Sequence, residues 1–279
     1  MLELCWDAVL DAVKMLPFLF GAYVLMEWME HRAADKMQRS LQRMKRFGPV
    51  GGALLGCFPQ CGFSVAAANL YAGRMITAGT LLAVFLSTSD EALPVLLAHP
   101  GSLRVIAGVI GVKIVVGAAF GSLCDGVIQP GQLAHNDENH LHMHCHDTGG
   151  AWPVVWAALR HTISTFAFVF IVMLAFNLAI DFVGQQTLQR ILLSGRAWQP
   201  VLAGLIGLIP NCAPSVLLTE LYLSGSLSFG SLLAGLCAGA GMGLVVLLRN
   251  NHNARQNVCI IGYLYAVSVL CGLVLQWIV

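Results

Sequence analysis

Two short stretches, 151 residues apart, interrupt apolar sequence with the same helix-breaking and polar residues. Residues 56–64 read Gly-Cys-Phe-Pro-Gln-Cys-Gly-Phe-Ser, and residues 207–215 read Gly-Leu-Ile-Pro-Asn-Cys-Ala-Pro-Ser. A proline inside a helix removes a backbone hydrogen bond, and an unsatisfied backbone group is costly where no water is present. The recurrence predicts a chain built from two halves that bring these breaks together.

The composition predicts that the chain lies in a membrane. It has 279 residues, of which 57% are hydrophobic and only 10% charged, and its mean hydropathy is +0.75. A soluble domain of this length needs more charge to cover its surface. Several apolar runs approach or exceed the length that crosses a bilayer. We therefore expect an all-α polytopic membrane protein.

The two interruptions belong to a longer internal repeat. Residues 56–97 and 207–248 align without a gap and share 15 identities in 42 positions. Chance would give roughly four in a composition so rich in Leu, Gly and Ala. This predicts a first transmembrane repeat over residues 1–125, a linker over 126–152 and a second repeat over 153–279.

The distribution of basic residues predicts an inverted repeat. The connection 31–46 carries six Lys and Arg residues and should be cytoplasmic, whereas its counterpart at about 182–199 carries two. Inverted repeats need an odd number of crossings per half. Each half has four apolar segments, so the interrupted one, with arms 48–58 and 61–72 in the first half, is expected to be a re-entrant helical hairpin. With three spanning helices per half, this gives about ten membrane segments, extracytoplasmic termini and a cytoplasmic linker.

The hairpin tips are the first candidate site. Helix ends that point into a cavity offer unpaired backbone groups, and thiols suit soft metals and metalloids. The prolines at the breaks could instead only kink helices for packing. The candidate substrate- or ion-binding residues at the tips are Gln60, Cys61, Ser64, Asn211, Cys212 and Ser215, and the breaks are at Pro59, Pro210 and Pro214.

Three carboxylates are further candidates for ion binding. Asp90 and Glu91 lie in the middle of the apolar segment 78–98, where acidic residues are costly and by default functional. They could bind a cation or carry a proton, or pair structurally with Lys113. Glu220 lies in the second arm of the second hairpin, where it could bind an ion or meet water at the end of the arm.

The linker has a metal-binding composition. His135, His140, His142, His144, Cys145 and His146 lie within 12 positions. Imidazole and thiol ligands suit first-row metals, so we expect a loop that captures metal with low specificity; a simple polar linker is the alternative. The other thiols, Cys5, Cys124, Cys237, Cys259 and Cys271, are expected to be buried as small apolar side chains.

The sequence contains no nucleophile elbow, phosphate-binding glycine loop or Walker motif. We therefore expect neither an enzyme nor an ATP-driven pump, no cofactor beyond a transported or loop-bound metal ion, and no nucleic-acid partner. The expected partners are the lipid bilayer, the substrate and a coupling proton or other ion; a homo-oligomer is compatible with the sequence.

The paired tips, the stretch Ser87-Thr88-Ser89-Asp90-Glu91-Ala92-Leu93-Pro94 and the His-rich linker together resemble one family over essentially the whole chain. This is the family of ten-transmembrane heavy-metal exporters, whose members are labelled as arsenic efflux or manganese transporters. The resemblance implies an inner-membrane protein that extrudes a metal or metalloid. It points to the tip residues together with Asp90 and Glu91.

The leading hypothesis is a proton-coupled secondary transporter that exports a heavy-metal cation or an arsenic-type metalloid. One alternative is an oxyanion transporter that uses the opposed helix N-termini of the hairpins. Another is a membrane metal sensor or assembly factor that acts through the His-rich loop, and an intramembrane enzyme is the most distant alternative.

Overall fold

The computed structural model describes residues 20–21, 47–57, 61–88, 92–98, 103–127, 198–211 and 213–278, with isolated positions between 156 and 171. The described part is helical and contains no strand. Its helices are α3 (Gly48–Gly56), α4 (Cys61–Ala72), α5 (Ala78–Ser87), α6 (Ala92–Leu97), α7 (Leu103–Val127), α10 (Gln199–Gly207), α11 (Ala213–Leu223), α12 (Phe229–Ala238), α13 (Met242–Asn250) and α14 (Ala254–Ile278).

The helix boundaries recur at the same offset of 151 residues as the sequence repeat. Helices α3, α5 and α7 begin and end 151 positions before α10, α12 and α14. The caps recur as well, because Thr77 accepts a hydrogen bond from the Thr80 amide at 3.1 Å and Ser228 accepts one from the Ser231 amide at 3.2 Å. A hydroxyl that caps a helix in this way satisfies one of its first unpaired amides. The repeat therefore extends from the sequence to local structure.

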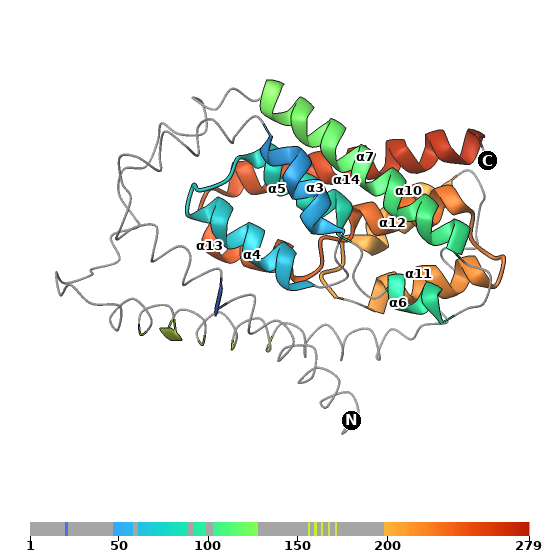
Figure 1. Ribbon diagram of the computed structural model, residues 1–279, viewed down its shortest axis with the longest axis horizontal. Coiled ribbons are helices and arrows are strands. Elements are labelled where there is room, and N and C mark those ends of the chain that lie inside the picture. Colours follow the sequence, from blue (N-terminus) through green and yellow to red (C-terminus); the bar gives the residue numbers. More distant parts are fainter. Residues whose placement is uncertain are drawn as a thin grey trace.

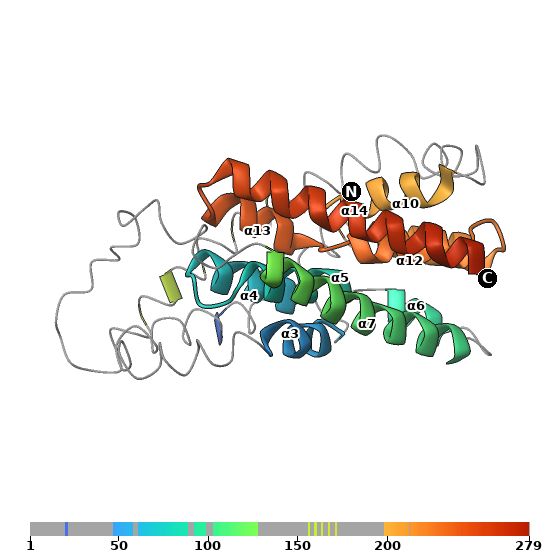
Figure 2. The ribbon, with the colours of Figure 1, turned by 90° about the horizontal axis from the view of Figure 1, so that it is seen from above.

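Glycine pairs allow the long helices to approach the interrupted ones closely. A Cβ atom at Gly79 would collide with the carbonyl oxygen of Gly121, and one at Gly230 would collide with that of Gly272. These two pairs lie 151 residues apart and join α5 to α7 and α12 to α14. Small residues at such crossings let helix backbones meet in a membrane. Figure 2 shows the result, with α3, α5 and α7 in one layer and α10, α12 and α14 in the other.

Short helices of each repeat also pack against helices of the other repeat. Helix α4 packs on α13, and α11 packs on α6, so each short helix lies against an element from the other repeat. Figure 1 places α4 and α13 at one end of the molecule and α6 and α11 towards the other. At the first contact, Asn250 Nδ2 donates a hydrogen bond to Asn69 Oδ1 at 2.5 Å. This crossed packing, in which α4 contacts α13 and α11 contacts α6, joins residues 61–97 of the first repeat to residues 213–250 of the second.

Within the part of the chain that the structure describes, four segments are long and apolar enough to cross a membrane, and they differ in burial. The apolar windows of Ala78–Leu97 and Phe229–Asn250 are 80% and 89% buried inside the protein, whereas those of Leu103–Gly126 and Ala254–Trp277 are only 22% and 28% buried. The outer pair exposes apolar side chains such as Val115 and Leu270, as helices in contact with lipid do. The expected all-helical, polytopic membrane protein is confirmed.

One expectation about the thiols is wrong. Cys124 and Cys237 are buried, but Cys259 is exposed on α14, because this long helix turns most of its surface away from the protein. Cys271 is half-buried, and Cys5 lies outside the described residues.

Candidate functional site

The candidate site lies where two buried helices end. Helix α5 ends at Ser87, and its C-cap, Thr88, has an extended ψ of 128°. Helix α12 ends at Ala238, and the backbone remains non-helical until α13 begins at Met242. Thr88 and Gly239 are 151 residues apart, so the two ends are equivalent in the repeat. Non-helical backbone at membrane depth is stable only where protein or a cavity surrounds it, which agrees with the burial of both segments.

The second break depends on a glycine. Gly241 has φ 54° and ψ −141°, a backbone conformation that residues with a side chain rarely adopt. The Ala240 amide donates to the carbonyl oxygen of Ala238 at 3.0 Å. In a continued α-helix this amide would instead bond the carbonyl of Leu236. The break therefore releases the Leu236 carbonyl oxygen from the helical pattern.

Lys113 bonds this released carbonyl and a second one at the other helix end. Its side chain is fully buried on α7, and its Nζ atom donates to the carbonyl oxygen of Leu236 at 2.7 Å and to that of Thr88 at short range. A buried ammonium group needs such acceptors to offset its loss of hydration. Lys113 thus holds together the ends of α5 and α12, which belong to different repeats.

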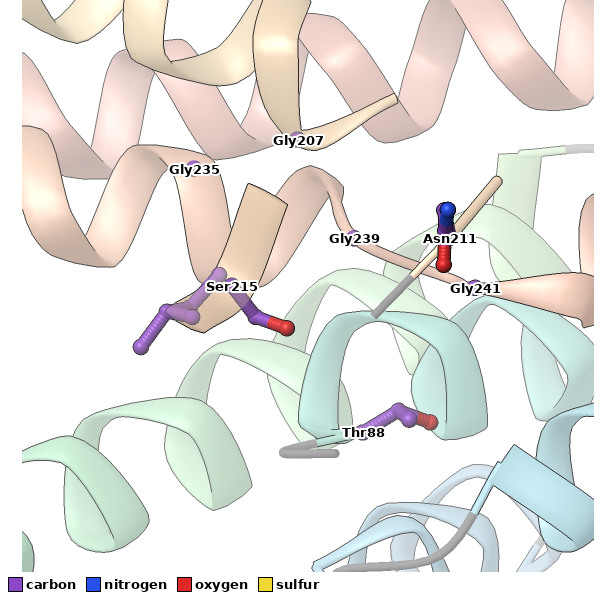
Figure 3. A pocket seen from close by; sticks show the side chains of 8 residues that line it. Thr88, Gly207, Asn211, Ser215, Gly235, Gly239 and Gly241 are labelled. Atoms are coloured by element: carbon purple, nitrogen blue, oxygen red, sulfur yellow. The ribbon is translucent and has the colours of Figure 1, made fainter. Parts of the chain in front are cut away.

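A small cavity lies beside these helix ends. Figure 3 shows Ser215, from the first turn of α11, at the left and Asn211, from the connection after α10, at the right, with Thr88 below them. The cavity has room for about one water-sized group. Its other walls are backbone-rich: the lining also includes Gly207, Gly235, Leu236, Gly239 and Gly241. Hydroxyl, amide and backbone groups thus gather at a point buried between the two repeats.

The structure places some of the tip residues at this cavity and others away from it. Asn211, which is only 7% exposed, and the half-buried Ser215 both line it. Ser64 is fully buried but packs against α13, where a Cβ atom at Gly243 would lie 2.9 Å from the Ser64 Cβ atom. Glu220 is exposed on α11 and does not line the cavity. Of the expected tip residues that the structure describes, those that line the cavity, Asn211 and Ser215, both come from the second repeat.

The structure describes two of the three prolines at the predicted breaks. Pro210 lies in the connection between α10 and α11, and Pro214 is buried in the first turn of α11, where a proline has no amide bond to lose. In the first repeat, Cys61 is the first residue of α4.

The remaining predicted residues lie outside the described part of the chain. They are Pro59, Gln60, Asp90, Glu91 and Cys212, together with His135, His140, His142, His144, Cys145 and His146 of the linker; the side chain of Cys61 is also outside it. Their predicted roles stay predictions. Among the described residues, no group of three or more His, Cys, Asp or Glu side chains could hold a metal ion.

Sequence reasoning missed three features of the site. Lys113 was considered only as a structural partner for the acids, and the bonds it makes to backbone carbonyls have no sequence signature. The apolar pattern of residues 229–248 predicts one segment without an interruption. The signal for its break was the cluster Gly239-Ala240-Gly241-Met242-Gly243, which aligns with the polar stretch after Ser87. Thr88 lies in that stretch but is not among the predicted site residues.

The fold and the site define a polytopic helical membrane protein whose interrupted helices meet at a buried polar junction, an architecture typical of transporters. A family model described as "Putative, 10TM heavy-metal exporter" matches residues 5–156 and 153–279. The chain therefore belongs to this family of metal-efflux transporters, and the family resemblance noted from the sequence is confirmed. No curated protein and no solved structure matches the chain.

Proposed function

We propose that the protein is a proton-coupled secondary transporter that exports a heavy-metal ion or an arsenic-type metalloid across the inner membrane. The observation that carries this proposal is the cavity between the ends of α5, α11 and α12, because it is polar, buried and lined from both repeats. Family membership supports the class of substrate. Asn211 and Ser215 would contact the substrate, and the carboxylates of Asp90 and Glu91 would carry the coupling proton.

The arrangement of the helices supports a mechanism of alternating access. We infer that the two repeats are inverted and that α3–α4 and α10–α11 are re-entrant hairpins. None of these helices exceeds 12 residues, or about 18 Å, so none crosses the bilayer alone. The crossed contacts of α4 with α13 and of α11 with α6 lie towards opposite ends of the molecule, as inverted repeats require. Movement of a hairpin against its partner helix would open the cavity to one side at a time.

Transport by everted membrane vesicles tests the proposal. Vesicles that contain the full chain should accumulate Cd²⁺, Zn²⁺, Mn²⁺ or arsenite when a proton gradient is imposed, and dissipation of the gradient should stop this. Asn211→Ala should lower the initial rate about tenfold, because the site loses a buried hydrogen-bonding group. Ser268→Ala is a matched control, since this buried hydroxyl bonds the Leu264 carbonyl of its own helix at 2.7 Å. Absence of flux for every substrate, or an Asn211→Ala rate equal to that of the control, would contradict the proposal.

An oxyanion is the second candidate substrate, and two observations favour it. The Lys113 ammonium group donates hydrogen bonds to the carbonyl oxygens of Thr88 and Leu236, two residues that line the cavity. The N-termini of α11 and α13 also begin beside the cavity, and helix N-termini favour negative charge. Saturable uptake of arsenate or another oxyanion that survives Asp90→Asn and Glu91→Gln together would establish this substrate instead of a cation.

A further inference from the structure

Lys113 lies deep in the long apolar helix α7. The helix runs from Leu103 to Val127, so Lys113 is about 15 Å along its axis from one end and about 21 Å from the other. A lysine near the end of a membrane helix can extend its ammonium group to the interface with water, but one at this depth meets its partners inside the protein. Because the side chain is also fully buried, its surroundings have to suit a cation.

The end of α5 presents a backbone oxygen to this cation. The Ser87 hydroxyl donates to the carbonyl oxygens of Ala83 at 2.8 Å and Val84 at 3.1 Å. The Thr88 hydroxyl donates to the carbonyl oxygen of Val84 at 2.7 Å. Both hydroxyl groups therefore bond the last turn of their own helix. The atom of Thr88 that accepts from the Lys113 Nζ atom is its carbonyl oxygen, one residue beyond the end of α5.

The end of α12 presents a second backbone oxygen to the same ammonium group. The Leu236 carbonyl oxygen accepts from Lys113 Nζ at 2.7 Å, and it is available because the Ala240 amide bonds the carbonyl of Ala238 instead. The carboxyl end of a helix carries a partial negative charge of about half a unit. Two such ends converge on Lys113, and both acceptor residues are buried. The field of the two helices and their oxygen atoms thus favour a cation at this point.

The cavity adjoins this point, so a small ion would have room to reach it. Thr88 and Leu236 both line the cavity, which holds about one water-sized group. Asn211 and Ser215 add an amide and a hydroxyl group to the lining. Backbone carbonyl oxygens are the groups that replace the hydration shell of a monovalent cation in selective channels. The acceptors of Lys113 are therefore of the type that also holds a free ion.

The packing of the repeat does not itself require a lysine at this position. The equivalent residue of the second repeat is Leu264, which is also fully buried. An apolar side chain thus fills the corresponding place on α14. The charge of Lys113, rather than its bulk, is the feature that belongs to one repeat only.

We propose that the carboxyl ends of α5 and α12 form a site for a monovalent cation and that the Lys113 ammonium group fills this site as a tethered ion. The inference goes beyond the proposed function, because it assigns neither the transported substrate nor the coupling ion. The covalent tether supplies the cation at any ion concentration outside the protein. Removal of the side chain should therefore leave a site that a free primary ammonium ion can enter.

The experiment tests whether a free cation can replace the tethered one. Lys113→Ala removes the side chain beyond Cβ, and n-propylammonium has the size and the charge of the missing part. The full chain in lipid nanodiscs is heated with increasing concentrations of n-propylammonium chloride, and unfolding is followed by tryptophan fluorescence. The melting temperature of Lys113→Ala should rise saturably by roughly 3 °C or more, because a ligand that binds only the folded state stabilises it. The neutral 1-propanol and the bulky choline ion should have much smaller effects.

Two variants are controls for the response to the amine. Lys113→Met fills the space without a charge, so the amine has no room to bind. Leu264→Ala opens an equally buried position in the second repeat, where the amine would meet no matching pair of helix ends. Neither melting temperature should respond. An equal response of Leu264→Ala, or an equal response of Lys113→Ala to 1-propanol, would overturn the inference, because the compounds would then only fill space.

A second substitution of Lys113 keeps the inference testable if Lys113→Ala does not fold. Lys113→Gln retains an N–H donor but has no charge, whereas Lys113→Arg retains the charge. A site that needs a cation should give Lys113→Arg a melting temperature several degrees above that of Lys113→Gln. A melting temperature of Lys113→Gln equal to that of the wild-type chain would show that a neutral donor is sufficient, and the cation site would be refuted.

The carboxylates of Asp90 and Glu91 provide a rival explanation for the charge of Lys113. In a chain that carries Asp90→Asn and Glu91→Gln, n-propylammonium should still stabilise Lys113→Ala if the carbonyl oxygens hold the cation. Loss of the response in that background would overturn the inference and assign the charge to pairing with the acids. These measurements report stability and require no transport, so failure of the inference and failure of the proposed function are distinguishable.

Discussion

The Nζ atom of Lys113 donates a hydrogen bond at 2.7 Å to the carbonyl oxygen of Leu236, a residue 123 positions later in the chain. The same ammonium group bonds the Thr88 carbonyl, so one side chain joins the interrupted helices of both repeats. The repeat mate of Lys113 is Leu264, which is equally buried but apolar. The hydrogen bonds that join the two helix ends therefore come from a side chain of the first repeat, and its equivalent in the second repeat cannot make them.

Replacement of Lys113 should weaken the fold. Lys113→Met keeps the length of the side chain but removes both bonds to the carbonyl oxygens of Thr88 and Leu236. Loss of charged hydrogen bonds at a buried site should lower the free energy of unfolding by about 2 to 4 kcal/mol. Thermal denaturation in detergent, followed by circular dichroism, measures the effect. The matched control Leu264→Met should cost less than about 1.5 kcal/mol, and equal melting temperatures for the two variants would contradict the role of Lys113.

The glycine contacts should be sensitive to a single methyl group in both repeats. Gly79→Ala and Gly230→Ala each place a Cβ atom against the carbonyl oxygen of a facing glycine. Each should destabilise the protein by about 1 to 3 kcal/mol, because packed backbones cannot move apart without loss of contact. Denaturation midpoints of the two variants should fall to a similar extent.

The chain supplies its own controls for this prediction. Gly111 and Gly262 are also 151 residues apart, and a Cβ atom at either position meets nothing within 4 Å. Gly111→Ala and Gly262→Ala should leave stability unchanged or raise it slightly, because alanine favours the helix. A uniform loss in all four variants would show that the close approaches have no special role.

Asp125 should stabilise the start of α5. Its Oδ1 atom accepts a hydrogen bond from the Gly79 amide at 2.8 Å, and its Oδ2 atom accepts one from the Thr77 hydroxyl at 2.6 Å. Asp125→Ala removes both bonds at a helix N-terminus and should cost about 1 to 3 kcal/mol in the free energy of unfolding. Ser122→Ala, one turn earlier on α7, removes an exposed hydroxyl that bonds its own helix and should have little effect. Indistinguishable unfolding curves would refute the prediction.

The contact between α4 and α13 can be tested by cross-linking. Asn69 and Asn250 are joined by a side-chain hydrogen bond at 2.5 Å, although they are 181 positions apart. In a background without native cysteines, Asn69→Cys together with Asn250→Cys should form a disulfide rapidly in native membranes after mild oxidation. Each single variant serves as a control for cross-links between molecules. After a protease cut in the linker, the two fragments should stay linked on a non-reducing gel; their separation would argue against the crossed packing.

The sequence predicted the helical segments well because their signals are local. Arms 48–58 and 61–72 correspond to α3 and α4 within two residues, since prolines and polar residues mark the break between them. The break between α12 and α13 was missed because Gly and Ala are frequent within membrane helices and do not by themselves signal an end.

The site was only partly predictable for a different reason. Asn211 and Ser215 could be selected because their side chains are polar in an apolar setting, and both reach the cavity. The partners of Lys113 are backbone carbonyl oxygens, which every residue has, so no residue type identifies them.

The packing of short helices against the other repeat has a consequence for how such a protein could arise. Helix α4 is covered by α13, and α6 is covered by α11, so a chain made of one repeat would leave the equivalent surfaces bare. A second copy of that chain could cover them in the same way. The ancestor of the duplicated chain would then be an obligate dimer. Identical subunits carry the same residue at equivalent positions. After the fusion of two copies, the two halves could differ, so that one half alone acquired a side chain such as that of Lys113.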